Sequence, residues 1–518
     1  MSPEAERVHQ RYLDLLDEIE TRFDVASWRI GDVDLWPPAR IDLFLDLFKA
    51  SGAETERPAP PFLQRMGGGL AAPLTNAWKS RRDLAHWRPW PRPADAILLG
   101  DAVTLDKADG AWRDRYGEPV MAALEQQGRT TFLMQPGGLE RLPWARPTFA
   151  ANTIAVRGAL GAALGRAPSA HLPDHSAVLD LLLQAGATAP SLGLARLGKR
   201  GRTIAAAASA FQRVLRIVQP RLAFAVTSYA GLGHAFALAC RREALLCVDL
   251  QHCPHSGAPR AYRWRDLPQQ GYSTLPAVFW TWTAEEAARI AASASPWHSS
   301  VHGGHSQLAA YLDHGDAALA DGAEFEREIL IALQPIGGRR EVWEALARQV
   351  QAAPRTWRWW IRRHPASTVF QDAEYRSLLA LRGPNVLVEE ACEPPLPALL
   401  RRMSVVVSLA SGSSTEAAAF GVPALFLGKE ALALFPGLIA RGDAELIDTA
   451  DLAPRIAAMP ARPAHARGAQ PPPIADTLMR LNRMAADYRD LCRGASLWAA
   501  RPTVLDGRVL LPSPPPMR

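Results

Sequence analysis

Cysteine is scarce in this chain, and its spacing excludes the sites that cysteine usually builds. The five cysteines are scattered along 518 residues, and none forms a C-x-x-C pair. Such a set is not the pattern of a structural zinc site or of a disulfide framework. It fits a reducing compartment, so we expect a cytoplasmic protein without a metal site.

Long apolar runs are missing as well. No stretch reaches the ~18 apolar residues that a membrane-spanning helix needs, and the charged N-terminus lacks the pattern of a signal peptide. We expect a soluble protein that touches at most the inner face of the cytoplasmic membrane. Such contact would involve Trp78–Pro93, which is rich in Trp, Arg and Pro. That segment fits either an anionic lipid surface or a Pro-rich connector with Trp–Arg stacking.

The charge is mixed and only mildly basic. Lys and Arg number 58 and Asp and Glu number 52, which gives a net charge of +6. No block of like charges marks a nucleic-acid-binding tail, so we expect no nucleic-acid partner. The excess is nearly all arginine and fits either phosphate binding or the codon bias of a GC-rich genome.

Several common catalytic motifs are also absent. The chain has no G-x-x-x-x-G-K-[ST] phosphate loop, no G-x-S-x-G nucleophile elbow and no H-E-x-x-H zinc motif. The segment Thr227–Gly233 follows an apolar run and contains glycine, but its spacing does not match G-x-G-x-x-G. A hydride-transferring enzyme is therefore disfavoured.

What the chain does contain is two series of short apolar runs that alternate with helical patterns. Continuous apolar runs of this length are typical of parallel strands covered on both faces. The fold class is therefore α/β, with two doubly wound, Rossmann-like domains. The predicted strands of the first series lie at 96–100, 130–134, 222–227, 245–250 and 278–282, and those of the second at 328–333, 358–363, 385–388, 405–410 and 423–428.

The same pattern suggests domain boundaries. We predict a helical N-terminal region at 1–90, a first domain at 91–310, a second at 325–475, and a C-terminal helix and tail at 476–518. Residues 1–90 show no strand alternation. The polar stretch 283–325 is interpreted as an interdomain linker.

Ligands in open α/β sheets bind beyond the carboxyl ends of the strands. Three segments of the second series have this position: Gly337–Gly338, His364–Pro365 and Ser411–Glu416. We therefore expect the ligand of the second domain to contact these loops.

The serine-rich loop is the most informative of the three. Ser411, Gly412, Ser413, Ser414, Thr415 and Glu416 lie between a predicted strand and a predicted helix. Backbone amides and hydroxyls at such a helix start can bind one phosphate, and Glu416 can accept hydrogen bonds from ribose hydroxyls. The alternative is structural: a serine caps the helix and Glu416 adds a capping interaction.

His364 ends a predicted strand directly after Arg362 and Arg363. The histidine can donate a hydrogen bond to phosphate, an arginine can add a charged contact, and Pro365 fixes the direction in which the chain leaves. Because side chains alternate along a strand, we expect at most one of the two arginines to point with His364. In the alternative, His364 caps the strand and the arginines face water.

The first series offers candidates for a general base. The predicted strand 245–250 leads into Gln251, His252, Cys253, Pro254 and His255. His252 is preferred, because an ordinary pKa near ~6.5 suits proton removal from a hydroxyl; His255 and Gln251 are further cleft candidates. Asp101, after the strand at 96–100, is an alternative base or a helix cap. His302 and His305 can reach the cleft from the linker.

Together these residues resemble bacterial GT-B glycosyltransferases that act on surface polysaccharides: capsule-type Kdo transferases, sialyltransferases and CDP-glycerol glycerophosphotransferases. His364–Pro365 resembles their His-Pro motif. The serine loop with Glu416, followed by Ala-Phe-Gly-Val-Pro at 419–423, resembles their second donor motif. Gln251–His252 is similar to their Gln-His-Gly segment, with Cys253 in place of the glycine. The resemblance covers roughly residues 220–450.

The resemblance implies a GT-B fold with a cleft between the domains, and a metal-independent glycosyltransferase without a cofactor. Its donor would be nucleotide-activated, with CMP-linked Kdo or nonulosonic acid as the expected sugar. Its acceptor would be a glycan, a lipid-linked glycan or a protein, as in lipopolysaccharide or capsule synthesis. Two alternatives remain: a sugar-nucleotide epimerase of the same architecture, and a non-catalytic GT-B-like binding subunit.

Overall fold

The computed structural model describes most of the chain but not every segment. Four predicted features lie outside the described residues: most of Trp78–Pro93, the pair Gly337–Gly338, Pro365 and His255. The described residues are 3–50, 91–108, 111–136, 148–165, 169–254, 259–265, 267–292, 295–312, 325–334, 340–364, 374–460, 472–499, 503–505 and 508–510.

The first domain is built on a seven-stranded parallel sheet. Its strands run in the order β12-β11-β10-β9-β3-β6-β7. Renumbered along the chain this order is 7-6-5-4-1-2-3, which is the doubly wound Rossmann order. The strands are β3 (Ala96–Leu99), β6 (Thr131–Gln135), β7 (Thr148–Ala150), β9 (Leu222–Val226), β10 (Cys247–Leu250), β11 (Val278–Thr281) and β12 (Ser299–His302).

The second domain repeats this order in a six-stranded parallel sheet, β15-β14-β13-β16-β17-β18. Two Rossmann-like domains were predicted, and the two sheets confirm that prediction. The strands are β13 (Arg327–Ala332), β14 (Trp357–Arg362), β15 (Val386–Leu387), β16 (Val405–Ser408), β17 (Ala424–Phe426) and β18 (Ala444–Leu446).

Helices cover both sheets, and their apolar residues explain why. In α12, the side chains of Trp343, Leu346, Ala347 and Val350 are buried at a spacing that forms one stripe on the helix. The helices of the two domains are α4 (Gly117–Gln126), α5 (Asn152–Leu164), α6 (His175–Gln184), α7 (Leu194–Val218), α8 (Gly233–Arg242), α9 (Pro259–Tyr262), α10 (Ala284–Ala292), α11 (Ser306–Leu312), α12 (Arg340–Ala352), α14 (Arg376–Leu379), α15 (Leu396–Leu400), α16 (Ser413–Ala419), α17 (Ala431–Leu434), α18 (Pro436–Ala440) and α19 (Leu452–Ala458).

The predicted linker at 283–325 is wrong for most of its described length. It contains α10, the edge strand β12 and α11. β12 has the sequence Ser-Ser-Val-His, and only Val301 is buried. Because an edge strand needs no continuous apolar run, the sequence pattern did not reveal it.

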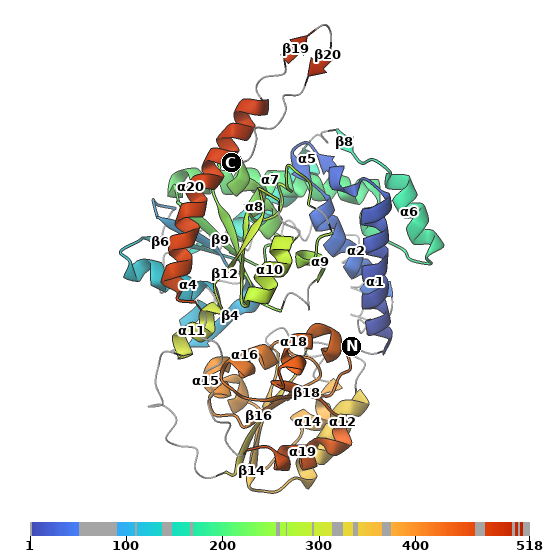
Figure 1. Cartoon of the computed structure of the whole chain (residues 1–518), viewed down its shortest axis with the longest axis vertical. Helices are drawn as coiled ribbons and strands as arrows, with labels where there is room; N and C mark the ends of the chain where they lie inside the picture. Colours follow the sequence, from blue (N-terminus) through green and yellow to red (C-terminus); the bar gives the residue numbers. More distant parts are fainter. Residues whose placement is uncertain are drawn as a thin grey trace.

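The first two helices and α20 pack onto the first domain. Tyr12 and Leu16 of α1 (Pro3–Arg22) belong to the same apolar core as α7 and α8, together with residues of α2 (Trp36–Ala50). At the other end, α20 (Ile474–Ala499) buries Leu478 and Leu481 against the first sheet, alongside that domain (Figure 1). The N-terminal region was predicted without strands, but β1 (Arg29–Ile30) and β2 (Val33–Asp34) pair in a small sheet with β8 (Ala170–His171).

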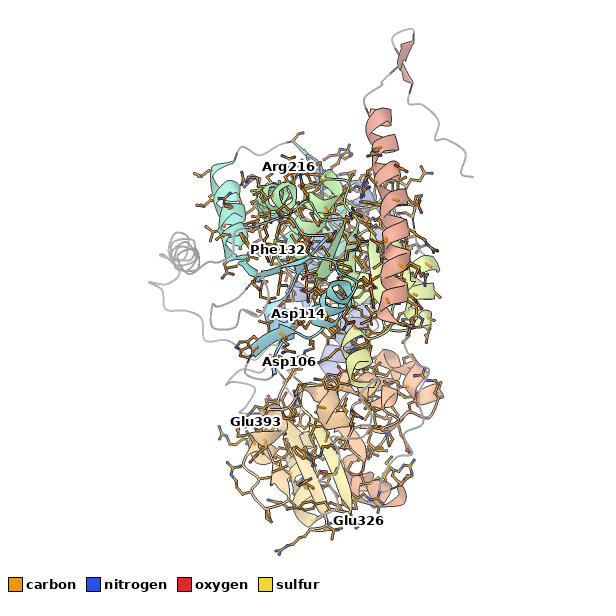
Figure 2. All side chains as sticks on the ribbon, turned by 90° about the vertical axis from the view of Figure 1, so that its left-hand side faces the viewer. Asp106, Asp114, Phe132, Arg216, Glu326 and Glu393 are labelled. Carbon is orange, nitrogen blue, oxygen red and sulfur yellow. The ribbon has the colours of Figure 1, made fainter. Side chains whose placement is uncertain are left out.

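The carboxyl ends of the two sheets face each other. Arg216, shortly before β9, and Glu326, directly before β13, lie on the sides of the two domains that face away from each other, whereas Asp106 and Glu393 lie on the facing sides (Figure 2). Asp106 belongs to a hairpin of β4 (Leu105–Ala108) and β5 (Ala111–Asp114), which projects from the first domain. None of the described helices is long and apolar enough to cross a bilayer.

Candidate functional site at the junction of the two domains

The strand order of the first sheet reverses between β3 and β9, and this is where an open α/β sheet leaves a crevice. Asp101, just past β3, accepts hydrogen bonds from the Thr227 hydroxyl and from the Val103 amide at 3.0 Å. Thr227, just past β9, has φ of 55°, a left-handed conformation that a β-branched residue rarely adopts. Asp101 therefore ties the two strand ends together and caps the short 3₁₀ turn Ala102–Thr104.

The corresponding point of the second sheet lies between β13 and β16 and is held differently. The side-chain amide of Gln334 donates to the Ala410 carbonyl at 2.7 Å and accepts from the Ala410 amide at 2.8 Å. Ser411 follows directly. The serine-rich loop thus begins at the carboxyl end of β16, where the strand order of the second sheet reverses.

A cavity of about 310 Å³ lies between the two domains. Arg362, Arg363 and His364 all line this cavity. β14 ends at Arg362, and it stays a prediction that at most one of the two arginines points with His364. The lining residues are Ala102, Val103, Leu105, Asp106, Trp112, Arg362, Arg363, His364, Cys392, Glu393, Pro394 and Pro395.

The two arginines are anchored within the second domain. Arg362 donates from Nη1 to the carbonyls of Ala391 and Pro394, both at 2.7 Å. Arg363 pairs with the exposed Glu389 at 2.9 Å. Burial, and then the charge of Arg115, lower the pKa of His364 to about 4. His364 is therefore neutral at pH 7 and can donate one hydrogen bond to an anion.

Arg115 comes from the first domain and was missed by the sequence reasoning. It follows β5, pairs with Asp106 at 2.7 Å, and has a buried Nε with no hydrogen-bond partner among the described residues. The charge of Arg115 lowers the pKa of His364 and of Arg362, and the charge of Glu416 raises the pKa of Arg115. Arg115 therefore lies near these three residues of the second domain. The available signal was its place in the connection from β3 to α4, the first strand-to-helix connection of the sheet.

The serine-rich loop forms the start of α16. Ser413 donates from Oγ to Ser411 Oγ at 2.9 Å, and its amide donates to the same oxygen at 3.3 Å. Ser414 is fully buried, and its hydroxyl has no partner among the described residues. The loop is two strands away from His364 on the same sheet edge and does not line the 310 Å³ cavity. Gly412 faces the first domain, since a Cβ there would lie 3.2 Å from Pro254.

Glu416 meets the first domain at His305, another residue of the supposed linker. The Glu416 Oε1 atom lies 3.8 Å from His305 Nε2, and each side chain is only 6% exposed. Glu416 Oε2 and His305 Nε2 have no hydrogen-bond partner among the described residues. Buried polar atoms are normally paired, so these two unpaired atoms on opposite sides of a domain junction are candidates for contact with a ligand.

His252, the predicted base, lies on the first domain beside an aromatic group. Its Nε2 is 3.0 Å from the Tyr229 hydroxyl. Its ring is 6.4 Å from that of Tyr116, which also contacts Trp282 and His305. The aromatic rings thus join His252 to the junction that holds His305 and Glu416.

Gln251 has a structural position rather than a free place in the cleft. Its amide nitrogen donates to the Cys253 carbonyl at 2.9 Å and to Glu286 at 2.8 Å, and its amide oxygen accepts from the Trp282 amide at 2.6 Å. These bonds engage both ends of the amide and hold the carboxyl ends of β10 and β11 together. Its direct contact with substrate stays a prediction.

Two buried carboxyls lie behind the carboxyl edge of the first sheet. Burial raises the pKa of Asp114 to about 6, although the Thr104 hydroxyl and the Gly117 amide donate to it. Burial likewise raises the pKa of Asp249 to about 6, with the Ser228 amide as a donor. These values lie where acid–base groups operate, but both side chains are almost fully buried. We interpret them as supports for the strand ends.

Comparison with known proteins assigns neither a family nor a function to this chain. No protein-family model matches the chain, and no curated protein matches it. Among solved structures, the chain is similar to UDP-GlcNAc 2-epimerase from Methanocaldococcus jannaschii in complex with UDP-GlcNAc and UDP (11% identity, 74% of this chain, 98% of that chain, TM-score 0.44). It is also similar to the glycosyltransferase SnogD from Streptomyces nogalater (15%, 79%, 100%, TM-score 0.40).

At such identities and TM-scores, these similarities carry no argument about the fold, the substrate or the reaction of this chain. The function must therefore be argued from the residues at the junction, and the resemblance to Kdo transferases and sialyltransferases stays a sequence-based expectation.

Proposed function

We propose that this chain is a glycosyltransferase that uses a nucleotide-activated sugar. The observation that carries the proposal is a group of two charged arginines, Arg115 and Arg362, and the neutral His364, which come from both domains and lie at the facing carboxyl ends of two Rossmann sheets. Arginines are suited to phosphate because their planar group donates several hydrogen bonds and keeps its charge. The donor phosphate would bind here, and Glu416 would accept hydrogen bonds from ribose or sugar hydroxyls.

The reaction follows from this placement. His252 would take the proton from an acceptor hydroxyl on the first domain, and the acceptor oxygen would form a bond to the anomeric carbon of the sugar. The bond from that carbon to the phosphate oxygen breaks, and its electron pair leaves with the nucleotide. Arg115 and Arg362 would stabilise the charge that develops on the leaving phosphate, and neutral His364 would add a hydrogen bond. Two arginines can neutralise that charge without a divalent metal or a cofactor. The donor we expect is CMP-linked Kdo or nonulosonic acid, with a glycan, a lipid-linked glycan or a protein as the acceptor.

An epimerase acting on a nucleotide sugar is the second candidate. The His305–Glu416 contact favours it, because an epimerase needs one group that removes a proton from the sugar and one that returns a proton. Incubating the protein with nucleotide sugars in the absence of an acceptor distinguishes the two. A new nucleotide sugar would indicate the epimerase, whereas sugar transfer that depends on an added acceptor would indicate the transferase.

Nucleotide binding is the direct test of the site. Calorimetry with CMP, CDP, UDP and GDP should give measurable affinity for at least one, and selectivity for cytidine would support the expected donor. We expect Glu416→Gln to weaken that affinity about tenfold or more, because it removes a charged hydrogen-bond acceptor. The same change at the distant strand β18, Glu445→Gln, is the control. Unchanged affinity in both Glu416→Gln and His364→Ala would refute the assigned site. Binding without any turnover would favour the non-catalytic subunit.

A further inference from the structure

The proposed base, His252, contacts two tyrosines that have different surroundings. Its Nε2 atom lies 3.0 Å from the Tyr229 hydroxyl, and the centres of these two rings are 5.5 Å apart. The ring of Tyr116 lies 6.4 Å from that of His252 and contacts His305 at the junction. Tyr229 instead packs against an apolar cluster inside the first domain, which includes Ile41 of α2. Tyr229 is therefore placed to hold His252 from within its own domain.

The backbone at Tyr229 is fixed in a tight turn. The Ala230 amide donates to the Thr227 carbonyl at 2.9 Å, which closes the turn around Ser228 and Tyr229. Within it, the Ser228 amide donates to Asp249 Oδ1 at 3.1 Å. Thr227 has φ of 55°, a conformation that a β-branched residue keeps only where its surroundings enforce it. The position of the Tyr229 backbone is thus set by contacts beyond the turn itself.

The carboxylate that holds this turn also holds the ring beside it. Asp249 is fully buried, and its Oδ2 accepts from the Tyr262 hydroxyl at 3.1 Å. The Tyr262 ring stands edge-on to that of Tyr229, with 5.8 Å between the ring centres. Helix α8 also begins directly against the turn, since a Cβ at Gly233 would lie 2.3 Å from the Ser228 carbonyl oxygen. Backbone and ring of Tyr229 are therefore both restrained.

A hydroxyl held at one nitrogen of a histidine influences which nitrogen carries the proton. Neutral imidazole has one N–H, and the hydrogen bond at one nitrogen sets the state of the other. Tyr229 contacts Nε2 of His252. A proton from the acceptor can then reach His252 only at Nδ1, and Nδ1 has a lone pair only if the ring proton is on Nε2. In that tautomer, Nε2–H donates to the Tyr229 oxygen.

We propose that Tyr229 is a positioning residue for His252, because its oxygen accepts from Nε2–H and so keeps the lone pair of His252 on Nδ1. This inference rests on the proposed function. The acceptor oxygen bonds to the anomeric carbon and its proton moves to Nδ1, while the electron pair of the broken carbon–oxygen bond leaves with the phosphate. The bond from Nε2–H to Tyr229 persists and stabilises the imidazolium that forms.

NMR of the histidine ring nitrogens in the full chain tests the tautomer without any turnover. The signals of His252 are identified by their absence in His252→Ala. At pH ~8, above the ordinary histidine pKa of ~6.5, wild-type His252 should be mainly the Nε2–H form, and Tyr229→Phe should convert it to a mixture. The control Tyr12→Phe, which removes a hydroxyl bonded to the Arg40 carbonyl at 3.2 Å, should leave His252 unchanged.

Circular dichroism should show that these variants are folded. The proposal is overturned if wild-type His252 is mainly the Nδ1–H form. It is also overturned if Tyr229→Phe has the same tautomers as the wild type.

Turnover tests whether Tyr229 acts only through His252. Tyr229→Phe should lower kcat about tenfold or more and leave the KM for the donor unchanged, because a hydrogen bond to the charged imidazole is lost. Added to His252→Ala, Tyr229→Phe should cause no further loss. Losses that multiply would overturn the proposal and make Tyr229 a residue that contacts the acceptor. If the tautomer depends on Tyr229 but His252→Ala keeps full turnover, the base of the proposed function is refuted, and only the control of the tautomer is supported.

Discussion

The carboxyl edges of the two sheets have the same strand order and carry different side chains. The first edge presents Asp101, His252 and His305, with aromatic rings and two carboxyls buried behind it. The second presents arginines, a neutral histidine and a serine-rich loop. In the proposed reaction, the edge of the first sheet supplies acid–base groups and the edge of the second sheet supplies anion-binding groups. Strand order is the same in both sheets and does not explain this difference. Arg115 and Glu416 are the exceptions, because each reaches the opposite domain.

The largest effect on kcat is expected from the proposed base, His252, at the carboxyl edge of the first sheet. We expect His252→Ala to lower kcat by ~10²–10⁴, because a positioned base contributes about that much. Affinity for the nucleotide should stay unchanged if the two edges have separate tasks. Initial rates over a range of donor concentrations measure both quantities, and His171→Ala on the exposed strand β8 is the control. Full turnover in His252→Ala would move the base to Asp101 or His305.

Removing the first domain's arginine tests the exception to this division. Arg115→Ala should lower kcat by ~10²–10³, the cost of losing one preorganised charge-stabilising contact. Arg129→Ala, which removes an arginine paired with Asp95 at 3.5 Å, should leave kcat unchanged. If Arg115→Ala changed only the KM for the acceptor, the arginine would belong to the acceptor site. Phosphate binding would then be confined to residues of the second domain.

Within the described parts of the chain, the two domains also differ in that only the first packs against the C-terminal helix α20. Leu481 of α20 is completely buried in that domain's core. Leu481→Ala should therefore lower the free energy of unfolding by about 2–5 kcal/mol, whereas Met479→Ala, at a side chain that is 52% exposed, should change it by about 0.5 kcal/mol or less. Denaturant unfolding followed by circular dichroism measures both. Equal effects of the two substitutions would mean that α20 does not stabilise the domain.

The smallest expected effect is a shift in the pKa of His364. The histidine should titrate near pH 4, and Arg115→Met should raise this pKa by less than burial lowers it, since burial is the larger cause. Because the unfolded chain takes up this proton near pH ~6.5, acidification from there towards pH 4 reduces folding stability. NMR titration of the imidazole measures the shift, with Arg129→Met as the control. If the pKa of His364 is unchanged in Arg115→Met, Arg115 does not lie close enough to His364 to affect its charge.

Sequence reasoning predicted the central strands and one half of the proposed site. β13 and β16 were predicted because they are continuous apolar runs, while the short edge strands β12 and β18 were missed because they are partly polar. His364 and the Ser411–Glu416 loop were found from their position after predicted strands. Arg115 and His305 were missed or ranked low, because their meaning depends on contacts with residues far away in the chain.

The alternation of apolar runs and helices by itself determined that this chain forms two doubly wound domains, since buried parallel strands require that pattern. It also determined which loops lie at the strand ends. The cleft between the two domains was expected only from the resemblance to a family. The tertiary structure alone decided that Arg115 and His305 meet the second domain. The physical reason is that periodicity reports only which face of an element is buried, whereas a contact between domains depends on how two finished cores are oriented.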